Sequence, residues 1–415
     1  MSEKKLATIF YADLWGLRNE KYDYLLRNDI KTTKWEELRP VEPYYFFVPK
    51  DFALQEEYGK FWKITDIFKE WSSGVKTHRD HFVVGFTKEE IIQRLRVFAG
   101  NLADDFVEEA LKLKDTGTWK LSEARKKIKD KRPEVKIYPY AYRPFDIRWI
   151  CYESSLIDRD RWPFMRYLLK VNLSLVATRI LSKPPFTHIL ISNCISDICL
   201  ISIKTKETAY FYPLYLYLDD PERRIFDEKT SGQERIPNFS NDFLQATKKS
   251  LNVEPTPEQI FYYIYAVLYC PQYRKHYEEF LRIDFPRIPL PKDYKSFKAL
   301  SNLGQELVDL HLLKHPSLSE TYIGFPESGS NIVEKVSHDE KNQKVFINKI
   351  QYFEGVSNKV WKYRIGAYQV MEKYLKDRKG RTLSLDEINH YLKVEKAIRL
   401  TIEIQRNINK IYAKI

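Results

Sequence analysis

The period of the apolar residues changes near residue 135, and this change constrains the fold more than any other feature of the sequence. From residue 52 to about 128 the apolar residues recur with a helical period, and Thr87 to Glu90 forms a capping box ahead of one apolar stripe. From 135 to 218 the chain consists of short β-rich runs between Pro, Ser, Asn and Asp turns. A helical period returns after Thr256. We therefore expect an α+β fold.

The chain is too long for one hydrophobic core, because its 415 residues exceed the size at which a single core stops growing. We expect a multidomain protein with an N-terminal part at 1–51, a helical spacer at 52–134, a β-rich core at 135–292 and a helical or mixed C-terminal part at 293–415. The N-terminal part is interpreted as two strands, around Phe10 and at 44–48. Since two strands are not stable alone, they are expected to be the edge of a larger sheet, either unsatisfied or covered by a partner.

The formal net charge of +12 suggests a polyanionic partner, and release of counterions from nucleic acid is the usual physical use of such a surplus. A basic protein without such a partner is an open alternative, and charge alone does not decide. The four cysteines form no Cys-x-x-Cys pair, so buried reduced thiols are expected. No segment has the apolar length of a membrane span, and the expected location is the cytoplasm.

Several catalytic chemistries are disfavoured by the residues present. None of the 13 glycines forms the Gly-rich turn that lets a backbone approach S-adenosylmethionine. The nearest match to the Asn-Pro-Pro-Tyr-type loop of amino methyltransferases is Lys183-Pro-Pro-Phe186, whose lysine cannot accept a hydrogen bond from an amine. Ser202 stands where a nuclease would need its second carboxylate, and His311 and His315 lack the glutamate of a zinc protease helix. We predict no catalytic, cofactor-binding or metal-binding residue.

The run Tyr142-Arg-Pro-Phe-Asp-Ile-Arg148 resembles a signature of the Type ISP and related Type IIG restriction–modification enzymes. In that family it belongs to the C-terminal specificity region that follows an adenine-specific methyltransferase domain. Any one similar stretch is weak, but several occur in the same order over nearly the whole chain. They include 10–16, 158–161, 192–197, 258–271, 363–369 and 374–381.

The resemblance implies sequence-specific recognition of double-stranded DNA on behalf of an adenine-N6 methyltransferase. The family's methylase motifs lie upstream of the segment that matches residues 10–16, so they are expected outside this chain. Residues 1–51 are then the remnant edge of a methyltransferase-like domain, and a methyltransferase domain or subunit is the expected protein partner. S-adenosylmethionine is expected on that domain, and the isolated chain is expected to be inactive.

Arginine and lysine are the residues expected to contact DNA, because they bind phosphates and arginine pairs with guanine. For Arg143 and Arg148 an ion pair with Asp146 that fixes the fold is the favoured alternative. For Arg159, Arg161 and Arg166 the alternative is an exposed, salt-bridged surface. For the basic turn at 376–381 the alternative is a solvated loop. The predicted DNA-binding residues are Arg143 and Arg148; Arg159, Arg161 and Arg166; and Lys376, Arg378, Lys379 and Arg381.

The sequence leaves the role of its densest basic run, the specificity loops and the rival functions open. The basic run at 120–136 is either a phosphate-facing element or, as we favour slightly, the solvated face of a helix. The side chains that choose a DNA sequence are expected in the loops at 204–208 and 221–235. The rival functions are an autonomous protein-interaction scaffold with incidental basic charge and an autonomous enzyme with an unrecognised site.

Overall fold

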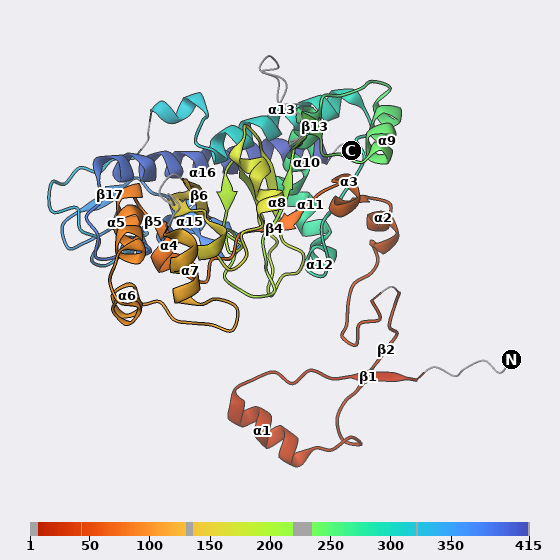
Figure 1. The fold of residues 1–415 in the computed structure, drawn as a ribbon. Helices are drawn as coiled ribbons and strands as arrows, with labels where there is room; N and C mark the ends of the chain where they lie inside the picture. The colour runs from red at the N-terminus through yellow and green to blue at the C-terminus, as the bar shows by residue number, and fades with distance from the viewer. Residues whose placement is uncertain (1–6, 43, 130–135, 219–234, 321–322, 414–415) are drawn as a thin grey trace. The chain divides into compact units, whose positions relative to one another are not determined.

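The structure is a computed structural model that describes residues 7–42, 44–129, 136–218, 235–320 and 323–413 (Figure 1). The chain separates into two compact units, Met1–Glu57 and Tyr58–Ile415. The described part is a mixture of helices and several small sheets, so the predicted α+β class is confirmed.

The first unit is built on a two-stranded antiparallel sheet. β1 (Ile9–Tyr11) pairs with β2 (Glu36–Leu38), and α1 (Arg18–Arg27) lies between them in the sequence. The strand predicted at 44–48 is wrong, because Tyr45 has a φ of 47°, which a strand does not allow. Helix α1 has no buried residue. In the described part of this unit, the small sheet therefore has no helix buried against it.

Residues 58–129 contain the predicted helices, but they also contribute strands to sheets formed with later segments. Thr87 caps α5 as expected, since its hydroxyl accepts a hydrogen bond from the backbone N of Glu90. β3 (Trp62–Lys63) pairs with β14 (Arg287–Ile288), β4 (Ser72–Ser73) with β11 (Tyr210–Pro213) and β5 (Val84–Gly85) with β7 (Asp146–Cys151). The helices between residues 55 and 128 are α2 (Gln55–Gly59), α3 (Ile64–Ile67), α4 (Asp80–Val83), α5 (Lys88–Ala99), α6 (Asp104–Leu111) and α7 (Leu121–Ile128).

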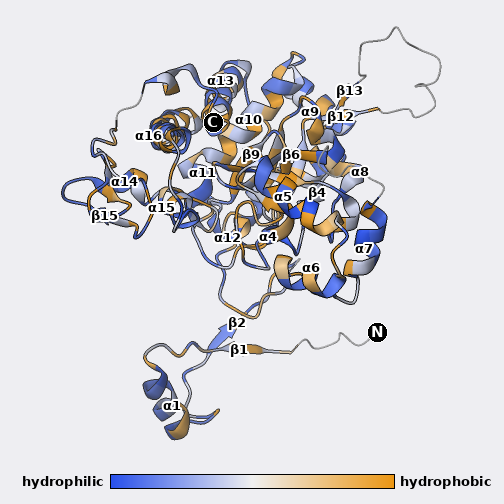
Figure 2. Ribbon diagram, turned by 60° about the vertical axis from the view of Figure 1, so that its left-hand side comes forward, coloured by the Kyte–Doolittle hydropathy of each residue, from blue (hydrophilic) through white to orange (hydrophobic). Residues whose placement is uncertain are grey.

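Two four-stranded sheets form the β-rich centre of the second unit. One has the order β10-β6-β7-β5, in which β10 and β6 are parallel and the other pairs antiparallel; the other has the order β4-β11-β8-β9. Figure 2 shows hydrophobic colour gathered in the middle of this unit, where strands such as β8 and β9 are fully buried. The remaining strands here are β6 (Ile137–Arg143), β8 (Ser174–Ala177), β9 (Ile189–Ser192), β10 (Ile195–Ser196), β12 (Tyr215–Tyr217) and β13 (Arg235–Pro237).

Three long helices pack together beside these sheets. α10 (Pro257–Tyr269) begins at a capping box on Thr256 and buries most of its residues against α13 (Tyr294–His311). A Cβ on Gly304 of α13 would lie 2.0 Å from the backbone oxygen of Tyr262, so only glycine permits this close approach. α13 also packs against α16 (Leu385–Tyr412), alongside which it runs in Figure 1. None of the helices in the described residues combines the length and the apolar character needed to cross a membrane.

The last third of the chain adds a small meander and the turn before α16. β15 (Ser337–Asp339), β16 (Lys344–Phe346) and β17 (Tyr352–Glu354) form a three-stranded antiparallel sheet. α15 (Val370–Lys376) ends at the predicted basic turn, and Ser384 begins α16 with a capping box. The other elements are α8 (Trp162–Met165), α9 (Asn241–Leu251), α11 (Pro271–His276), α12 (Glu278–Leu281), α14 (Asn358–Trp361), β18 (Arg364–Ile365) and β19 (Tyr368–Gln369).

Candidate functional site

Two of the three predicted basic groups meet at Asp146. The motif at 142–148 forms the hairpin of β6 and β7, which places Asp146 at the first position of β7. Its Oδ2 accepts hydrogen bonds from Arg148 Nε at 3.0 Å and Nη2 at 2.8 Å. Its Oδ1 accepts one from Arg378 Nη2 at 2.9 Å, although the two residues are 232 positions apart in the sequence. The carboxylate thus joins the β6–β7 hairpin to the turn after α15.

Asp146 is only 2% exposed, so its charge is stabilised by its neighbours and not by water. Burial alone would raise the pKa of Asp146, but the charges of Arg378 and Arg148 outweigh burial and hold this pKa below its usual value. Arg378 also donates from Nε to Glu387 Oε1 at 2.9 Å. The expected ion pair between Arg148 and Asp146 is present, and it is part of a larger buried network.

Arg143 lies in a second buried pair close by. Its Nη1 donates to Asp197 Oδ1 at 3.2 Å, and Asp197 Oδ2 accepts from the Tyr140 hydroxyl at 2.8 Å. Burial raises the pKa of Asp197 more than the charge of Arg143 lowers it. Arg143, Arg148 and Arg378 therefore hold carboxylates inside the protein, and their predicted contact with DNA stays a prediction.

Aromatic rings separate the guanidinium groups of this region. The guanidinium carbons of Arg143 and Arg148 lie 3.8 and 3.9 Å from the centre of the Tyr142 ring. Those of Arg148 and Arg381 lie 4.3 and 3.9 Å from the centre of the Phe86 ring. Such contacts are each worth about 0.5–2 kcal/mol and also fix the planes of the guanidinium groups. We call Arg143, Arg148, Arg378 and Arg381, with Tyr142, Phe86 and Asp146, the arginine cluster.

The turn that follows α15 gives this cluster an exposed basic edge. Lys379 is exposed, and Gly380 has a φ of 79° that favours glycine. Lys376 is exposed beside Glu372, with 2.8 Å between Nζ and Oε1. Arg381 is partly exposed and lies 3.1 Å from Glu90 Oε1. We call Lys376, Lys379 and Arg381 the basic edge. Its exposed cations are suited to bind a polyanion by electrostatic attraction.

The third predicted group, Arg159, Arg161 and Arg166, lies on a different segment that leads into α8. Arg159 is exposed and 3.7 Å from Asp158 Oδ2. Arg161 has a φ of 57° and is partly buried, and Arg166 donates from Nε to the Pro163 carbonyl at 3.0 Å. The ion pair of Arg159 is local, so the structure does not bring this group to Asp146 as it does the other two.

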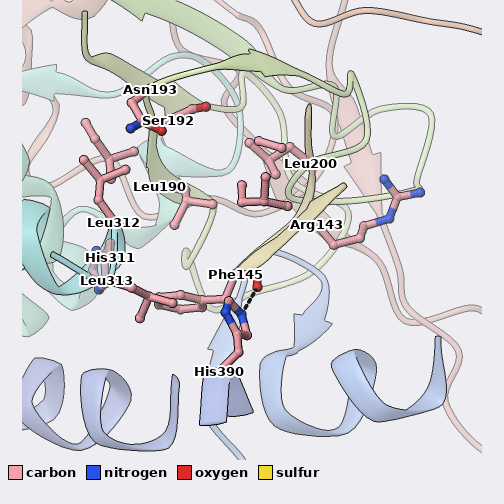
Figure 3. A pocket seen from close by; sticks show the side chains of 13 residues that line it. Arg143, Phe145, Leu190, Ser192, Asn193, Leu200, His311, Leu312, Leu313 and His390 are labelled. Atoms are coloured by element: carbon pink, nitrogen blue, oxygen red, sulfur yellow. Dashed lines mark hydrogen bonds between the residues drawn. The ribbon is translucent and has the colours of Figure 1, made fainter. Parts of the chain in front are cut away.

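A cavity of about 70 Å³ is lined by Arg143 of the arginine cluster together with Phe145, His311 and His390 (Figure 3). His390 on α16 contacts the backbone carbonyl of Phe145 at 2.7 Å, shown as the dashed line in the figure. His311 also lines this cavity, where its Nδ1 lies 2.6 Å from the Tyr265 hydroxyl and its Nε2 lies 3.0 Å from Thr401 Oγ1. Because Thr401 donates its own proton to the Ala397 carbonyl, His311 Nε2 donates to Thr401 and Nδ1 accepts from Tyr265. His311 is thus a satisfied neutral histidine.

The buried histidine makes the protein sensitive to acid. Burial lowers the pKa of His311 to about 3, so the unfolded chain takes up a proton below pH 6.5 while the folded chain does not. Stability is therefore expected to fall as pH decreases from 6.5 toward 3. At pH 5 this one group accounts for about 2 kcal/mol.

Urea unfolding at pH 7 and pH 5 measures this loss. His311→Gln is expected to reduce the difference between the two pH values. His315→Gln, one turn further along the chain and outside the cavity, is the control and should keep the wild-type difference. Equal differences in all three proteins would contradict this assignment.

The other sequence features can also be located. Phe186 of the Lys183-Pro-Pro-Phe186 run is 1% exposed, so its ring is not available to stack on a base. In the loop at 204–208, Glu207 points inward to His188 Nε2 at 3.1 Å, while Lys204 remains near the surface. Most of the loop at 221–235 lies outside the described residues. Within the described ranges, no three His, Cys, Asp or Glu side chains gather as metal ligands would.

Sequence reasoning missed Phe86 and Glu90 as parts of the site. Both lie at the start of α5, far in sequence from either arginine segment, and the only local signal was the capping box at Thr87. It also missed that Glu387, the capping-box residue of α16, binds Arg378. These residues connect three separate stretches of sequence, which no local pattern reveals.

Comparison with known proteins gives a family and a fold. The family model described as the Type ISP C-terminal specificity domain matches residues 66–406. No curated protein matches the chain. Ten solved chains match, and the three described next, at 19–20% identity, show the fold.

Three of these structures cover nearly all of the chain. A nuclease-deletion mutant of the Type ISP restriction–modification enzyme LlaGI, in complex with a DNA substrate mimic, has 20% identity and a TM-score of 0.68, over 96% of this chain and 33% of that one. A DrdV–DNA complex has 20% identity and a TM-score of 0.73, over 97% and 43%. The ATP-dependent Type ISP enzyme LlaBIII bound to DNA has 19% identity and a TM-score of 0.68, over 90% and 25%. The chain thus spans less than half the length of each.

Proposed function

This chain belongs to the family of Type ISP C-terminal specificity domains, and from that premise we propose that it recognises a sequence in double-stranded DNA for a restriction–modification enzyme. The finer proposal is that the enzyme is an adenine-N6 methyltransferase of the Type ISP or Type IIG kind. The observation that carries the proposal is the convergence of two basic sequence segments on Asp146 with an exposed basic edge beside them. The DNA-bound state of the three similar structures supports it.

The buried and exposed cations have different roles in this proposal. Arg148 and Arg378 hold the β6–β7 hairpin and the turn after α15 together through Asp146. The basic edge then contacts phosphates, because its three side chains reach water and its ion pairs are at the surface. Arg159 is exposed in the same way and is proposed as a further phosphate contact. Contacts of this kind position a duplex and do not read its sequence.

The chemistry of methyl transfer is proposed to lie outside this chain, on a methyltransferase domain or subunit that binds S-adenosylmethionine. The first unit supports a protein partner, since the segment between its two strands carries exposed apolar side chains. Trp15, Leu26 and Ile30 are each more than 80% exposed, which is costly for a monomer in water. A protein-interaction scaffold, the alternative function, would use the same side chains, and the dependence of binding on salt distinguishes the two.

Duplex binding by the whole 415-residue chain at several salt concentrations tests the proposal. A specificity module with six to ten phosphate contacts is expected to lose affinity by about 10³–10⁵-fold between roughly 50 and 200 mM salt. A scaffold with incidental charge would show little dependence on salt. Calorimetry with S-adenosylmethionine is expected to show no binding. Methyl transfer to DNA by this chain alone would refute the division of roles.

A further inference from the structure

The β16–β17 hairpin ends in a turn at residues 347–351, here called the hairpin tip, which is fixed by one buried amide. Gln351 is 1% exposed. Its Oε1 accepts from the backbone N of Asn331 at 2.7 Å and from Asn348 Nδ2 at 3.0 Å. Its Nε2 donates to Asn331 Oδ1 at 2.7 Å and to the Glu327 carbonyl at 3.1 Å. All four hydrogen bonds that a glutamine amide can make are therefore formed.

The backbone of the hairpin tip is held equally firmly. Asn348 Oδ1 accepts from the backbone N of Ile350 at 3.0 Å and of Gln351 at 2.7 Å, and Asn348 Nδ2 also donates to the Ile332 carbonyl at 3.1 Å. A Cβ on Gly329 would lie 2.7 Å from Gln351 Cδ, so the glycine makes room for the buried amide. The hairpin tip is a rigid turn, and the amides of both Asn348 and Gln351 are fully used inside it.

Two side chains of this rigid turn face water. Ile350 is 66% exposed, and Lys349 is exposed. A single exposed isoleucine is ordinary on a protein surface. Here, however, the seven hydrogen bonds of the Asn348 and Gln351 side chains hold the turn in a conformation that presents the isoleucine beside a lysine. A turn built so firmly around two outward side chains is suited to recognition, because little conformational entropy is lost when they bind.

The hairpin tip lies on the same flank as the basic edge. Residues 329–335 run between the two: the backbone N of Glu334 donates to the Ile347 carbonyl at 2.8 Å, and that of Val333 donates to the Arg381 carbonyl at 3.0 Å. Gly380 N donates back to the Val333 carbonyl at 2.8 Å. Ile347, the first residue of the hairpin tip, is thus two strand spacings from residues 380–381, roughly 10 Å.

We propose that the hairpin tip enters a groove of the duplex whose phosphates the basic edge contacts, and that Lys349 and Ile350 contribute to the choice of sequence. This inference rests on the proposed function. A major groove about 12 Å wide, bordered by phosphates, accepts a two-stranded β-ribbon at this spacing. The Lys349 ammonium can donate to the O6 and N7 acceptors of guanine, and Ile350 can contact the methyl group of thymine. From the sequence, the specificity loops are expected at other positions of the chain, 204–208 and 221–235.

Enrichment from a library of duplexes with randomised positions tests the proposal on the whole chain. Wild-type protein is expected to enrich a preferred sequence. Lys349→Ala combined with Ile350→Ala is expected to keep total duplex affinity within about threefold, while preference at one or two base pairs falls about fivefold or more. Lys349→Arg should retain preference for guanine, because arginine makes the same contact bidentately. The matched control is Lys249→Ala with Val253→Ala, an exposed lysine and valine at the end of α9, which should leave the profile unchanged.

The outcomes separate the two proposals. A wild-type chain that binds no duplex at low salt would refute the proposed function itself. A wild-type chain that enriches a sequence, with the Lys349 and Ile350 double variant enriching the same sequence equally well, would refute the role of the hairpin tip alone. An unchanged urea unfolding midpoint shows that the double variant is folded, as expected for two exposed side chains.

Discussion

Asp146→Ala is expected to lower the free energy of unfolding by about 3–5 kcal/mol, the cost of leaving buried charges without their partner. Both carboxylate oxygens of Asp146 accept from arginines, and Arg148 and Arg378 are themselves largely buried. Arg148 would keep only Asp377, at 3.5 Å, and Arg378 would keep Glu387. Because Asp377 also pairs with Lys373, three positive charges would then share two carboxylates in a region that water reaches poorly.

Urea unfolding followed by tryptophan fluorescence measures this change. Glu254→Ala is the matched control, since it breaks an ion pair with Lys248 in which both side chains are more than half exposed. Such pairs contribute little to stability, and the control should unfold at the wild-type midpoint. If Asp146→Ala unfolds at the same midpoint as the control, the network around Asp146 does not hold the site together.

The second large effect is expected when the charge of the basic edge is removed. Lys376→Gln, Lys379→Gln and Arg381→Gln together should make the dependence of log affinity on log salt less steep by about 2.7, or about 0.9 for each phosphate contact. The ratio of wild-type to variant affinity for the duplex should then be about 40-fold smaller at roughly 200 mM salt than at roughly 50 mM. The loss should be uniform across DNA sequences, because phosphates are the same in all of them.

The basic run on α7 provides the control with the same change in net charge. Lys126, Lys127 and Lys129 are exposed on the helix that the sequence left open as a phosphate-facing element or a solvated face. We expect their triple replacement by glutamine to leave the salt dependence near that of the wild type. Equal effects of the two triple variants would mean that total charge, and not the basic edge, governs binding.

Local chemistry was predictable from the sequence, and long-range chemistry was not. The caps of α5, α10 and α16 form at Thr87, Thr256 and Ser384 because the hydroxyl and the backbone N–H that donates to it lie within one turn. The strand predicted at 44–48 is absent, because the left-handed backbone of Tyr45 interrupts an otherwise strand-like aromatic run. A local pattern of residues does not report a backbone conformation of this kind.

The candidate site shows the same limit. The pairing of Arg148 with Asp146 was foreseen, because the two side chains are two residues apart on one strand. The second partner of Asp146 is Arg378, and the ring shared by Arg148, Arg378 and Arg381 is Phe86. These contacts depend on how β5, β7 and the turn after α15 come together, which residue spacing does not encode.

The bond between Asp146 and Arg378 also has a consequence for synthesis on the ribosome. The two residues are separated by 232 positions, so at about 5–20 residues per second roughly 12–46 s pass between their translation. During that interval Asp146 in the nascent β6–β7 hairpin can pair with Arg148, but Arg378 has not yet been synthesised. The hairpin therefore reaches its native burial only late, after the turn that follows α15 has left the exit tunnel.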